Sequence, residues 1–351
     1  MRFSKFIALV CPEGKDPAQK YAESLSQIQL ADQAGFHGIW LSENHFSSRR
    51  ALPDLQGEIG ITPKPLMFGM KIVENTRRIR VGTAVRNIVF THPVLVAEEA
   101  LTFDLLSGGR LDLGVGCGYR PWEFTGFGIP QAEARSRFLE SLEILDLALR
   151  GEPFSFNGQY YKLPEVSVVP KPYYSLPRPK LFLATGDPAQ IKLAAQKDYG
   201  VMSFSTSSKE HLLNLVQTYT EIAGPLGYDV SPHRFPVTRQ IYIHRDPAVA
   251  DEYAARNLPY YQAALGDFKA CPPLEELKKL YIIGTPEDCV SQLKALRDEM
   301  GCTHVILWFN FGWLTHQEVM DQMELFAQQV MPHFNESELS PSTLQPEAVP
   351  Q

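Results

Sequence analysis

Short apolar segments alternate with longer segments whose apolar residues recur every three or four positions, and this alternation runs along almost the whole chain. A short continuous apolar run is typical of a strand buried on both faces, whereas the longer spacing is typical of an amphipathic helix. Strands that alternate with helices form parallel sheets, so the pattern predicts an α/β fold, a (β/α)8 TIM barrel. The eight predicted strands span residues 3–10, 39–41, 79–85, 111–115, 180–184, 200–204, 237–243 and 303–309.

Three segments interrupt this regular order. Residues 152–179 contain six prolines and include the adjacent Tyr160 and Tyr161, which predicts a small hairpin and an extended connection. Residues 245–283 form a long insert between the seventh and eighth predicted strands. The tail, 336–351, is rich in serine, proline and glutamate, so we predict that it is disordered and that residues 1–335 form a single domain.

A doubly wound sheet is the alternative fold for such a pattern. Its usual mark is a Gly-x-Gly-x-x-Gly turn after the first strand, and the nearest candidate here begins at Gly114. That motif begins on the fourth strand and has Tyr119 where the third glycine belongs, so we do not interpret it as a dinucleotide-binding turn. Its glycines would instead let a flat ligand ring approach the backbone closely.

Charge and cysteine usage favour a small molecule as the ligand. The net charge is -7, from 40 acidic and 33 basic residues, and this balance argues against nucleic acid or an anionic membrane as a partner. The five cysteines are widely spaced, which indicates neither a disulfide framework nor a zinc site. The apolar run near the N-terminus, residues 6–11, is too short for a signal peptide core, so we expect a cytoplasmic protein.

Polar residues follow the second predicted strand directly. Glu43, Asn44 and His45 follow the apolar run at residues 39–41, with only Ser42 between them. In a parallel barrel the carboxyl ends of the strands face the ligand, so this triplet is placed to contact a substrate. His45 is a candidate acid or base because histidine titrates close to neutral pH.

Several segments resemble the luciferase-like flavin-dependent monooxygenase family, and they occur in the family's order over nearly all of residues 1–335. Residues 40–46, Trp-Leu-Ser-Glu-Asn-His-Phe, are similar to the Glu-His-His-Phe segment after the family's second strand. The other matching segments are residues 81–84 with 91–94, 107–116, 135–138 and 311–332.

This resemblance implies that reduced FMN binds at the mouth of the barrel, reacts with dioxygen to a C4a-hydroperoxide and oxygenates a small organic substrate. It also implies a separate NAD(P)H:flavin reductase, a homodimer, and a mobile lid formed by residues 245–283. The implied cofactor-binding residues are Thr83, Gly116, Cys117, Tyr119, Arg137, Thr185 and Gly186. Candidates for the apolar substrate pocket are Trp40, Phe46, Trp122 and Trp308.

The chain departs from the family pattern at three positions. Asn44 stands where luciferases have a histidine base, and an amide cannot take up a proton near neutral pH, so His45 or Glu43 would have to replace that base. Cys117 stands where many members have an arginine near the flavin phosphate. Asp187 stands where members offer serines to the phosphate, and its charge would weaken flavin binding.

Three other functions remain open on sequence grounds. The same scaffold could transfer hydride with the deazaflavin F420. A hydrolase barrel could hold a metal with Glu43, His45 and His92, although the other strand ends offer few ligands. Finally, the chain could bind flavin without catalysing a reaction.

Overall fold

The computed structural model describes residues 1–334, apart from 49–56, 267–272 and 312. The tail predicted to be disordered, 336–351, lies outside the described residues.

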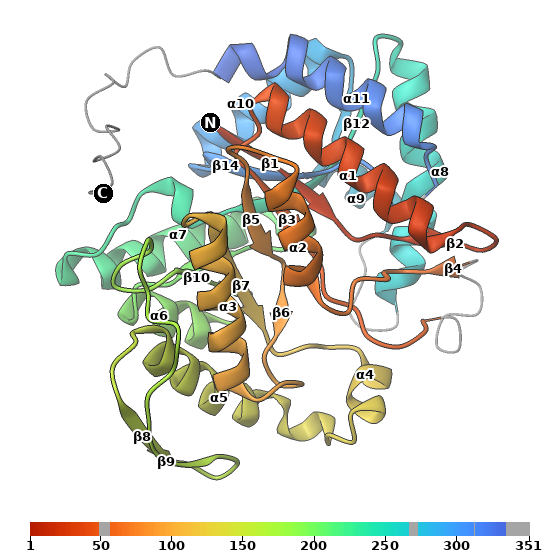
Figure 1. The fold of residues 1–351 in the computed structure, drawn as a ribbon. Coiled ribbons are helices and arrows are strands. Elements are labelled where there is room, and N and C mark those ends of the chain that lie inside the picture. Colours follow the sequence, from red (N-terminus) through yellow and green to blue (C-terminus); the bar gives the residue numbers. More distant parts are fainter. Residues whose placement is uncertain (49–56, 267–272, 312, 335–351) are drawn as a thin grey trace, which may run out of the picture.

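A parallel sheet lies at the centre of the molecule (Figure 1). Apart from β13, its main strands follow one another in space as they do in sequence, and β14 pairs with β1. A parallel bridge between Ser203 and Val237 links β11 to β12. In spatial order the strands are β11 (Gly200–Met202), β10 (Lys180–Ala184), β7 (Leu111–Gly116), β5 (Arg80–Thr83), β3 (Gly38–Leu41), β1 (Arg2–Ile7), β14 (His304–Trp308), β12 (Val237–Ile243) and β13 (Ile282–Gly284), with β6 (Arg86–Asn87) paired to β7.

The molecule is therefore an α/β fold whose parallel sheet curls as in a TIM-like barrel, and all eight predicted strands are present with ends shifted by a few residues. Two short antiparallel pairs lie outside this sheet. One joins β2 (Cys11–Pro12) to β4 (Gly57–Glu58), and the other is the predicted hairpin of β8 (Phe154–Asn157) and β9 (Lys162–Val166).

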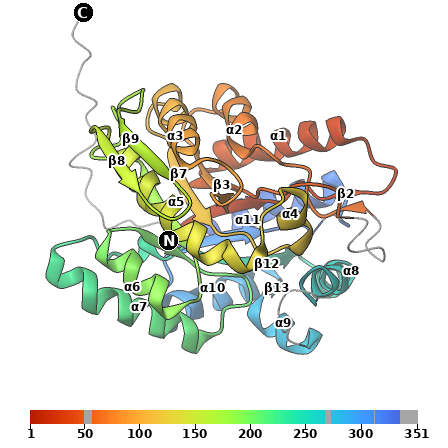
Figure 2. The same ribbon diagram turned by 90° about the horizontal axis from the view of Figure 1, so that it is seen from below.

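Helices cover the outer side of the sheet (Figure 2). Neighbours pack in pairs, with α3 against α2 and α5, α6 against α7, and α1 against α11. The α-helices are α1 (Pro17–Ala34), α2 (Pro65–Glu74), α3 (Pro93–Ser107), α4 (Pro121–Gly126), α5 (Ala134–Leu149), α6 (Pro188–Gln196), α7 (Lys209–Ala223), α8 (Pro247–Gly266), α9 (Leu274–Leu280), α10 (Pro286–Met300) and α11 (His316–Gln329). Short 3-10 turns are η1 (Gln131–Glu133), η2 (Gly224–Leu226), η3 (Pro232–Arg234) and η4 (Met331–Phe334).

Local caps explain where many helices begin and end. Asp16 accepts a hydrogen bond from the backbone of Ala18 at the start of α1, and Gly35 ends that helix with a φ of 87°. Thr285 and Thr315 each form a reciprocal capping box, at the starts of α10 and α11. These caps use residue types that can be recognised in the sequence, namely an acid or a threonine before a helix and a glycine after it.

The insert between β12 and β14 contains regular elements. Its first part is α8, and α9 leads into β13, which pairs with β12 in register from Ile241 to Ile243. Part of the insert thus extends the sheet. A mobile lid over residues 245–283 stays a prediction.

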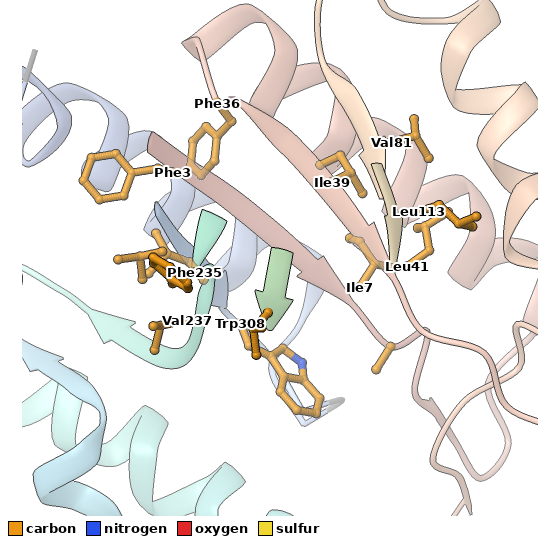
Figure 3. Close-up of a cluster of buried hydrophobic side chains, with 14 of the residues drawn as sticks. Phe3, Ile7, Phe36, Ile39, Leu41, Val81, Leu113, Phe235, Val237 and Trp308 are labelled. Carbon is orange, nitrogen blue, oxygen red and sulfur yellow. The ribbon is translucent and has the colours of Figure 1, made fainter. Parts of the chain in front are cut away.

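Two apolar layers hold the fold together. Outward-facing residues of the strands pack against the helices, and Figure 3 shows some of these, such as Ile39, Val81 and Leu113. A second, smaller cluster fills the inside of the sheet and consists of Trp40, Phe182, Met202 and Ile306. Gly82 makes this inner cluster possible, because a Cβ there would lie 2.4 Å from the Trp40 indole. Among the described helices, none is long and apolar enough to cross a membrane.

Candidate active site

A cavity of about 270 Å³ opens at the carboxyl ends of the parallel strands. Ligands of α/β barrels bind at this end, so its position marks a candidate active site. Its lining residues are Phe6, Ala8, Ser42, Glu43, Asn44, Ile59, Ala84, Val85, Asn87, Gly116, Cys117, Gly118, Tyr119, Arg120, Glu123, Ala184, Met202, Ser203, Phe204, Ser205, Thr238, Tyr261, Trp308 and Phe311.

One wall of the cavity is aromatic. The ring of Trp308 lies 4.6 Å from that of Phe6 and 5.0 Å from that of Phe311. Tyr261, from α8, packs edge-on against both Trp308 and Phe311, and its hydroxyl bonds to the Ser205 hydroxyl. Such a wall keeps water out of this side of the cavity and offers a large apolar contact surface to a ligand.

The polar wall of the cavity includes Asn44, whose side chain is held at both ends. Its amide nitrogen donates to the Ser42 hydroxyl at 2.8 Å, and its oxygen accepts from Nη1 of Arg120. Gly60 leaves the space for this arrangement, because a Cβ there would stand 2.1 Å from the Asn44 nitrogen. The orientation of Asn44 is therefore fixed by its surroundings.

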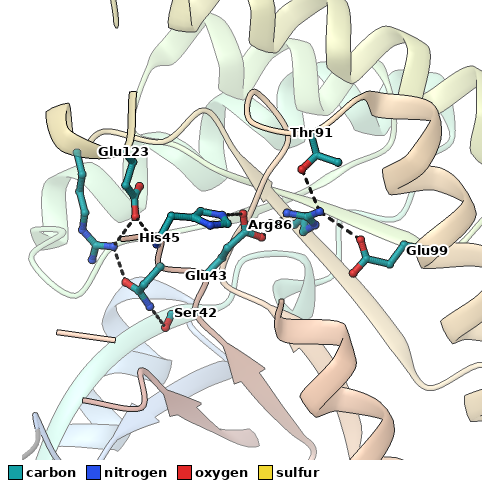
Figure 4. Close-up of polar contacts among 9 residues, drawn as sticks. Ser42, Glu43, His45, Arg86, Thr91, Glu99 and Glu123 are labelled. Atoms are coloured by element: carbon teal, nitrogen blue, oxygen red, sulfur yellow. Dashed lines mark hydrogen bonds and ion pairs between the residues drawn. The ribbon is translucent and has the colours of Figure 1, made fainter. Parts of the chain in front are cut away.

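Glu43 lies at the centre of a buried charged chain (Figure 4). Its Oε1 lies 2.8 Å from Nε2 of His45, and its Oε2 accepts from Nη1 of Arg86 at 2.6 Å. Arg86 continues the chain to Glu99 and Thr91, each at 3.2 Å. The Glu43 and Arg86 side chains are 0% and 1% exposed, so each charge depends on the other for compensation.

Glu123, near the start of α4, is the second carboxyl group on the polar wall. Its Oε1 accepts from the backbone N–H of His45 at 2.9 Å and from Nη1 of Arg120 at 3.4 Å. Burial raises the pKa of Glu123, and Arg120 with the His45 N–H offsets only part of that effect. Arg120 thus joins Asn44 to Glu123 through a single nitrogen atom.

The cavity brings together part of the residue set predicted from sequence: Glu43, Asn44, Gly116, Cys117, Tyr119 and Trp308. His45 lies just behind this lining, where its ring packs edge-on against Phe127 at 4.8 Å. Thr83 is fully buried and donates its hydroxyl to the Gly114 carbonyl.

Three of the predicted aromatic residues do not line the cavity. Trp40 belongs to the cluster inside the sheet and meets Phe182 edge-on at 5.3 Å. Phe46 is 52% exposed and packs on Phe127 instead. Trp122, on the outer part of α4, lies within reach of the Arg120 guanidinium at 5.9 Å.

The residues predicted to hold a phosphate lie beyond the rim of the cavity, where α5 approaches the start of α6. Arg137 forms an ion pair with Glu133 at 2.8 Å and stacks over Tyr160. Its neighbour Arg135 pairs with Asp187 at 2.5 Å.

Asp187 also acts as the N-cap of α6. Its carboxylate accepts from the backbone of Ala189, and its own N–H donates to the hydroxyl of Thr185. Gly186 follows Thr185 and faces the ring of His211, which a Cβ at this position would meet at 3.4 Å. In this arrangement Asp187 occupies the place at the helix start where an anion could bind, and it compensates Arg135.

No group of three or more potential metal ligands occurs among the residues that the structure describes. His92 contacts Tyr161 and caps α3, so it does not join Glu43 and His45. That part of the chain therefore offers no metal site that would support the metal-dependent hydrolase interpretation.

A comparison with known families decides what kind of protein carries this site. The family model described as luciferase-like monooxygenase matches residues 1–304. The chain belongs to this family.

Several curated relatives of this luciferase-like chain are monooxygenases by name. It is 27% identical to 4-hydroxyprotoasukamycin monooxygenase of Streptomyces nodosus subsp. asukaensis, over 95% of this chain and 92% of that protein. It is 26% identical to limonene 1,2-monooxygenase of Rhodococcus erythropolis, over 95% and 86%. It is 24% identical to the oxygenase component of the flavin-dependent trigonelline monooxygenase of Acinetobacter baylyi, over 97% of each.

Solved structures share the fold. Monooxygenase RslO1 from Streptomyces bottropensis superposes with a TM-score of 0.87 at 27% identity, covering 95% of this chain and all of that one. The oxygenating constituent of 3,6-diketocamphane monooxygenase from Pseudomonas putida, in complex with FMN, gives 0.77 at 16% identity, over 95% and 98%. An F420-dependent secondary alcohol dehydrogenase gives 0.72 at 17%, over 95% and 99%. The last two likenesses establish the fold alone.

Sequence reasoning about this luciferase-like chain missed three charged residues that line the polar wall or support it from behind. Arg86 follows a predicted strand without any regular pattern, and Arg120 and Glu123 flank the start of a helix of six residues, too short to show a period. An acid near a helix start is usually a solvated charge that complements the helix dipole. Only the burial of Glu123 separates it from that ordinary case.

Proposed function

We propose that this protein is the oxygenase component of a two-component monooxygenase, which uses reduced FMN and O2 to insert one oxygen atom into a small organic substrate. The observation that carries this proposal is the cavity itself, because one wall is aromatic and the other is a fixed hydrogen-bonding network. Membership of the luciferase-like family and the names of the curated relatives support it.

The lining residues fit a flavin ring. Ala84, Val85, Gly116 and Ala184 have small side chains or none, so they leave space in the cavity. Gly116 in particular has no room for a side chain, because a Cβ there would lie 2.6 Å from the Val85 side chain. Nε of Arg120 is buried and has no hydrogen-bond partner among the described residues, which leaves a donor for a polar ring edge. When bound, reduced flavin would supply two electrons and activate dioxygen.

The residues of this chain would bind, orient and shield. Gly116, Cys117 and Tyr119 would hold the ring, while Thr185, Gly186 and Arg137 would approach the phosphate at the rim. Trp308, Tyr261 and Phe311 would exclude water and contact the apolar body of the substrate.

A phosphate at the rim would compete with Asp187 for Arg135 and for the start of α6. We therefore expect modest flavin affinity, as suits a cofactor that a separate NAD(P)H:flavin reductase supplies in reduced form. The name of the Acinetobacter relative, an oxygenase component, supports this division of labour.

F420 is the second candidate cofactor. Asn44 cannot serve as the base that luciferases use at this position, and hydride transfer with a deazaflavin needs no oxygen chemistry. A solved neighbour of the same fold binds an F420 adduct, which supports the same option.

We also propose that residues 245–283 cover the site, since Tyr261 of α8 reaches the aromatic wall. Limited proteolysis of this segment should slow when FMN is added. An unchanged pattern would argue for a fixed insert.

Anaerobic titration of the purified protein with reduced FMN, and in parallel with reduced F420, tests the proposed function. We expect saturable binding of FMN, followed on rapid mixing with oxygenated buffer by reoxidation that is slower than that of free reduced FMN. Saturable binding of F420 without binding of FMN would overturn the proposal.

A pair of glycine variants controls this titration. Gly116→Ala should weaken FMN binding, because the new methyl group would collide with Val85 in the cavity. Gly224→Ala should not, since no atom lies within 4 Å of a Cβ at that surface position. Equal loss in both variants would show that the titration does not report on this cavity.

A further inference from the structure

The cavity needs a group that can hold a proton, and Asn44 is not one. An amide side chain donates and accepts hydrogen bonds but does not titrate near neutral pH. The charged or titratable groups that line the cavity are Glu43, Cys117, Tyr119, Arg120, Glu123 and Tyr261. Two of these are carboxyl groups, and the structure distinguishes them.

Both carboxylate oxygens of Glu43 already have a partner. Its Oε1 is engaged by His45 and its Oε2 by Arg86, at 2.8 and 2.6 Å, and the side chain is fully buried. Protonation of Oε2 would remove the partner of an almost fully buried guanidinium, which is strongly unfavourable. Glu43 is therefore fixed in its role as the counter-charge of Arg86.

Glu123 is differently placed. Within the part of the chain that the structure describes, both hydrogen-bond partners of its carboxyl group, the His45 N–H and the Arg120 guanidinium, approach Oε1. Across the described ranges of the chain, nothing donates a hydrogen bond to Oε2. The residue is 1% exposed and lines the cavity, so its second oxygen can hold a proton without losing a native partner.

We propose that Oε2 of Glu123 is the atom at which this protein holds and releases a proton in the cavity, in place of the base that Asn44 cannot provide. This inference rests on the proposed function. Arg120 is the connecting element, since Nη1 donates both to Asn44 and to Glu123. The side chain at position 44 would then position Arg120 beside the carboxyl group.

The chemistry balances with the reactants already named. In the reaction S + O2 + FMNH2 → SO + FMN + H2O, the electrons and both hydrogen atoms of water enter with reduced FMN. Oε2 gives one proton to the oxygen atom that leaves as water and takes one back before the next turnover. Glu123 thus ends each cycle in the state in which it began.

The charges that face Glu123 set the direction of its titration. Arg120, at the start of α4, favours the carboxylate form of Glu123. His45, on the loop after β3, favours it too, through its backbone N–H and through its charge when it is protonated. Burial opposes them and is the larger effect, so the pKa is raised. The proton should therefore be held below that raised pKa and released above it.

Infrared difference spectroscopy of the cofactor-free protein during a pH titration tests this directly. In the described part of the chain, burial raises the pKa of two carboxyl groups, Glu123 and Asp104. We expect two protonated-carboxyl components that titrate above 4.5 and 3.8, the ordinary values for these two residue types. Glu123→Gln should remove one of them and Asp104→Asn the other.

Asp104 is the matched control because it is just as buried but bonds to Ser175 and does not line the cavity. Glu123→Asp keeps a carboxyl group and should keep a titrating component. The inference is overturned if Glu123→Gln leaves both components in place, or if the component it removes titrates at or below 4.5.

A kinetic measurement separates this inference from the proposed function. Once a substrate is oxygenated, the pH profile of kcat should contain one ionisation that Glu123→Gln removes and Asp104→Asn keeps. If the wild-type protein oxygenates nothing, the proposed function fails, and the infrared titration still decides where the proton is held. An unchanged profile in Glu123→Gln would refute the inference alone.

Discussion

We predict that Arg86 stabilises the protein by compensating the buried charge of Glu43, and Arg86→Met tests this. The substitution keeps an aliphatic chain of similar length but removes the charge. Glu43 would retain one partner, His45 at 2.8 Å, and would lose the guanidinium 2.6 Å from its other oxygen. Because both side chains are almost fully buried, we expect a loss of about 3–5 kcal/mol in the free energy of unfolding.

The other contacts of Arg86 change this figure little. Its bond to Glu99 is 3.2 Å long, and that carboxylate is 27% exposed, so the ion pair contributes about 0–1 kcal/mol. Urea unfolding at neutral pH, followed by fluorescence and circular dichroism, measures the change, provided that the two probes give the same midpoint. Arg135→Met is the matched control, since that arginine is 59% exposed in its pair with Asp187 and should lose about 0–1 kcal/mol.

The double variant Glu43→Gln/Arg86→Met decides whether an uncompensated charge is the cause. Replacing the stranded carboxylate by an amide should recover at least half of the loss, because the uncompensated charge is gone. A single Arg86→Met variant that unfolds at the wild-type urea concentration would refute the reasoning. So would a double variant no more stable than the single one.

Three further predictions follow from other parts of the molecule. Burial lowers the pKa of Lys5 from 10.5 to about 7. Between pH 7 and 10.5 the unfolded chain therefore binds one proton more than the folded chain, so the free energy of unfolding should rise with pH. Lys5→Met should abolish that rise in unfolding experiments at several pH values. Gly60→Ala should lower the free energy of unfolding by about 1–3 kcal/mol in thermal unfolding, because the new Cβ would stand 2.1 Å from the amide of Asn44. Gly224→Ala, where no atom lies within 4 Å of a Cβ, should lower it by less. The groove between α2 and α3 leaves Met67 73% and Leu106 61% exposed, and we predict that this surface is the contact of a homodimer. Leu106→Glu should therefore weaken self-association in sedimentation experiments, while Leu176→Glu, at an equally exposed site elsewhere, should not.

The order of strands and helices could be predicted because it depends on local patterns. The periodic apolar residues of α7 and the proline at the first position of α3 act within a few residues of themselves. The hairpin of β8 and β9 was likewise indicated by the composition of its own segment. Family membership could be predicted for a related reason, since several weak motifs occur in a fixed order.

The composition of the site is a different matter, because it depends on which side chains the curved sheet brings together. Trp40 and Trp308 both lie at or near strand ends in apolar runs, yet Trp40 fills the inside of the sheet against Gly82 while Trp308 forms the aromatic wall. Nothing local distinguishes them.

Local sequence patterns were enough to predict the architecture, the family and the position of Glu43 and Asn44 after the second strand. The partners of these two residues depend on the folded chain. Arg120 and Glu123 reach Asn44 and His45 across 76 and 78 residues of chain, and burial alone turns an ordinary helix-start carboxylate into a group with a raised pKa. Local periodicity records which face of an element is apolar, whereas desolvation and charge pairing depend on neighbours that only the folded chain provides.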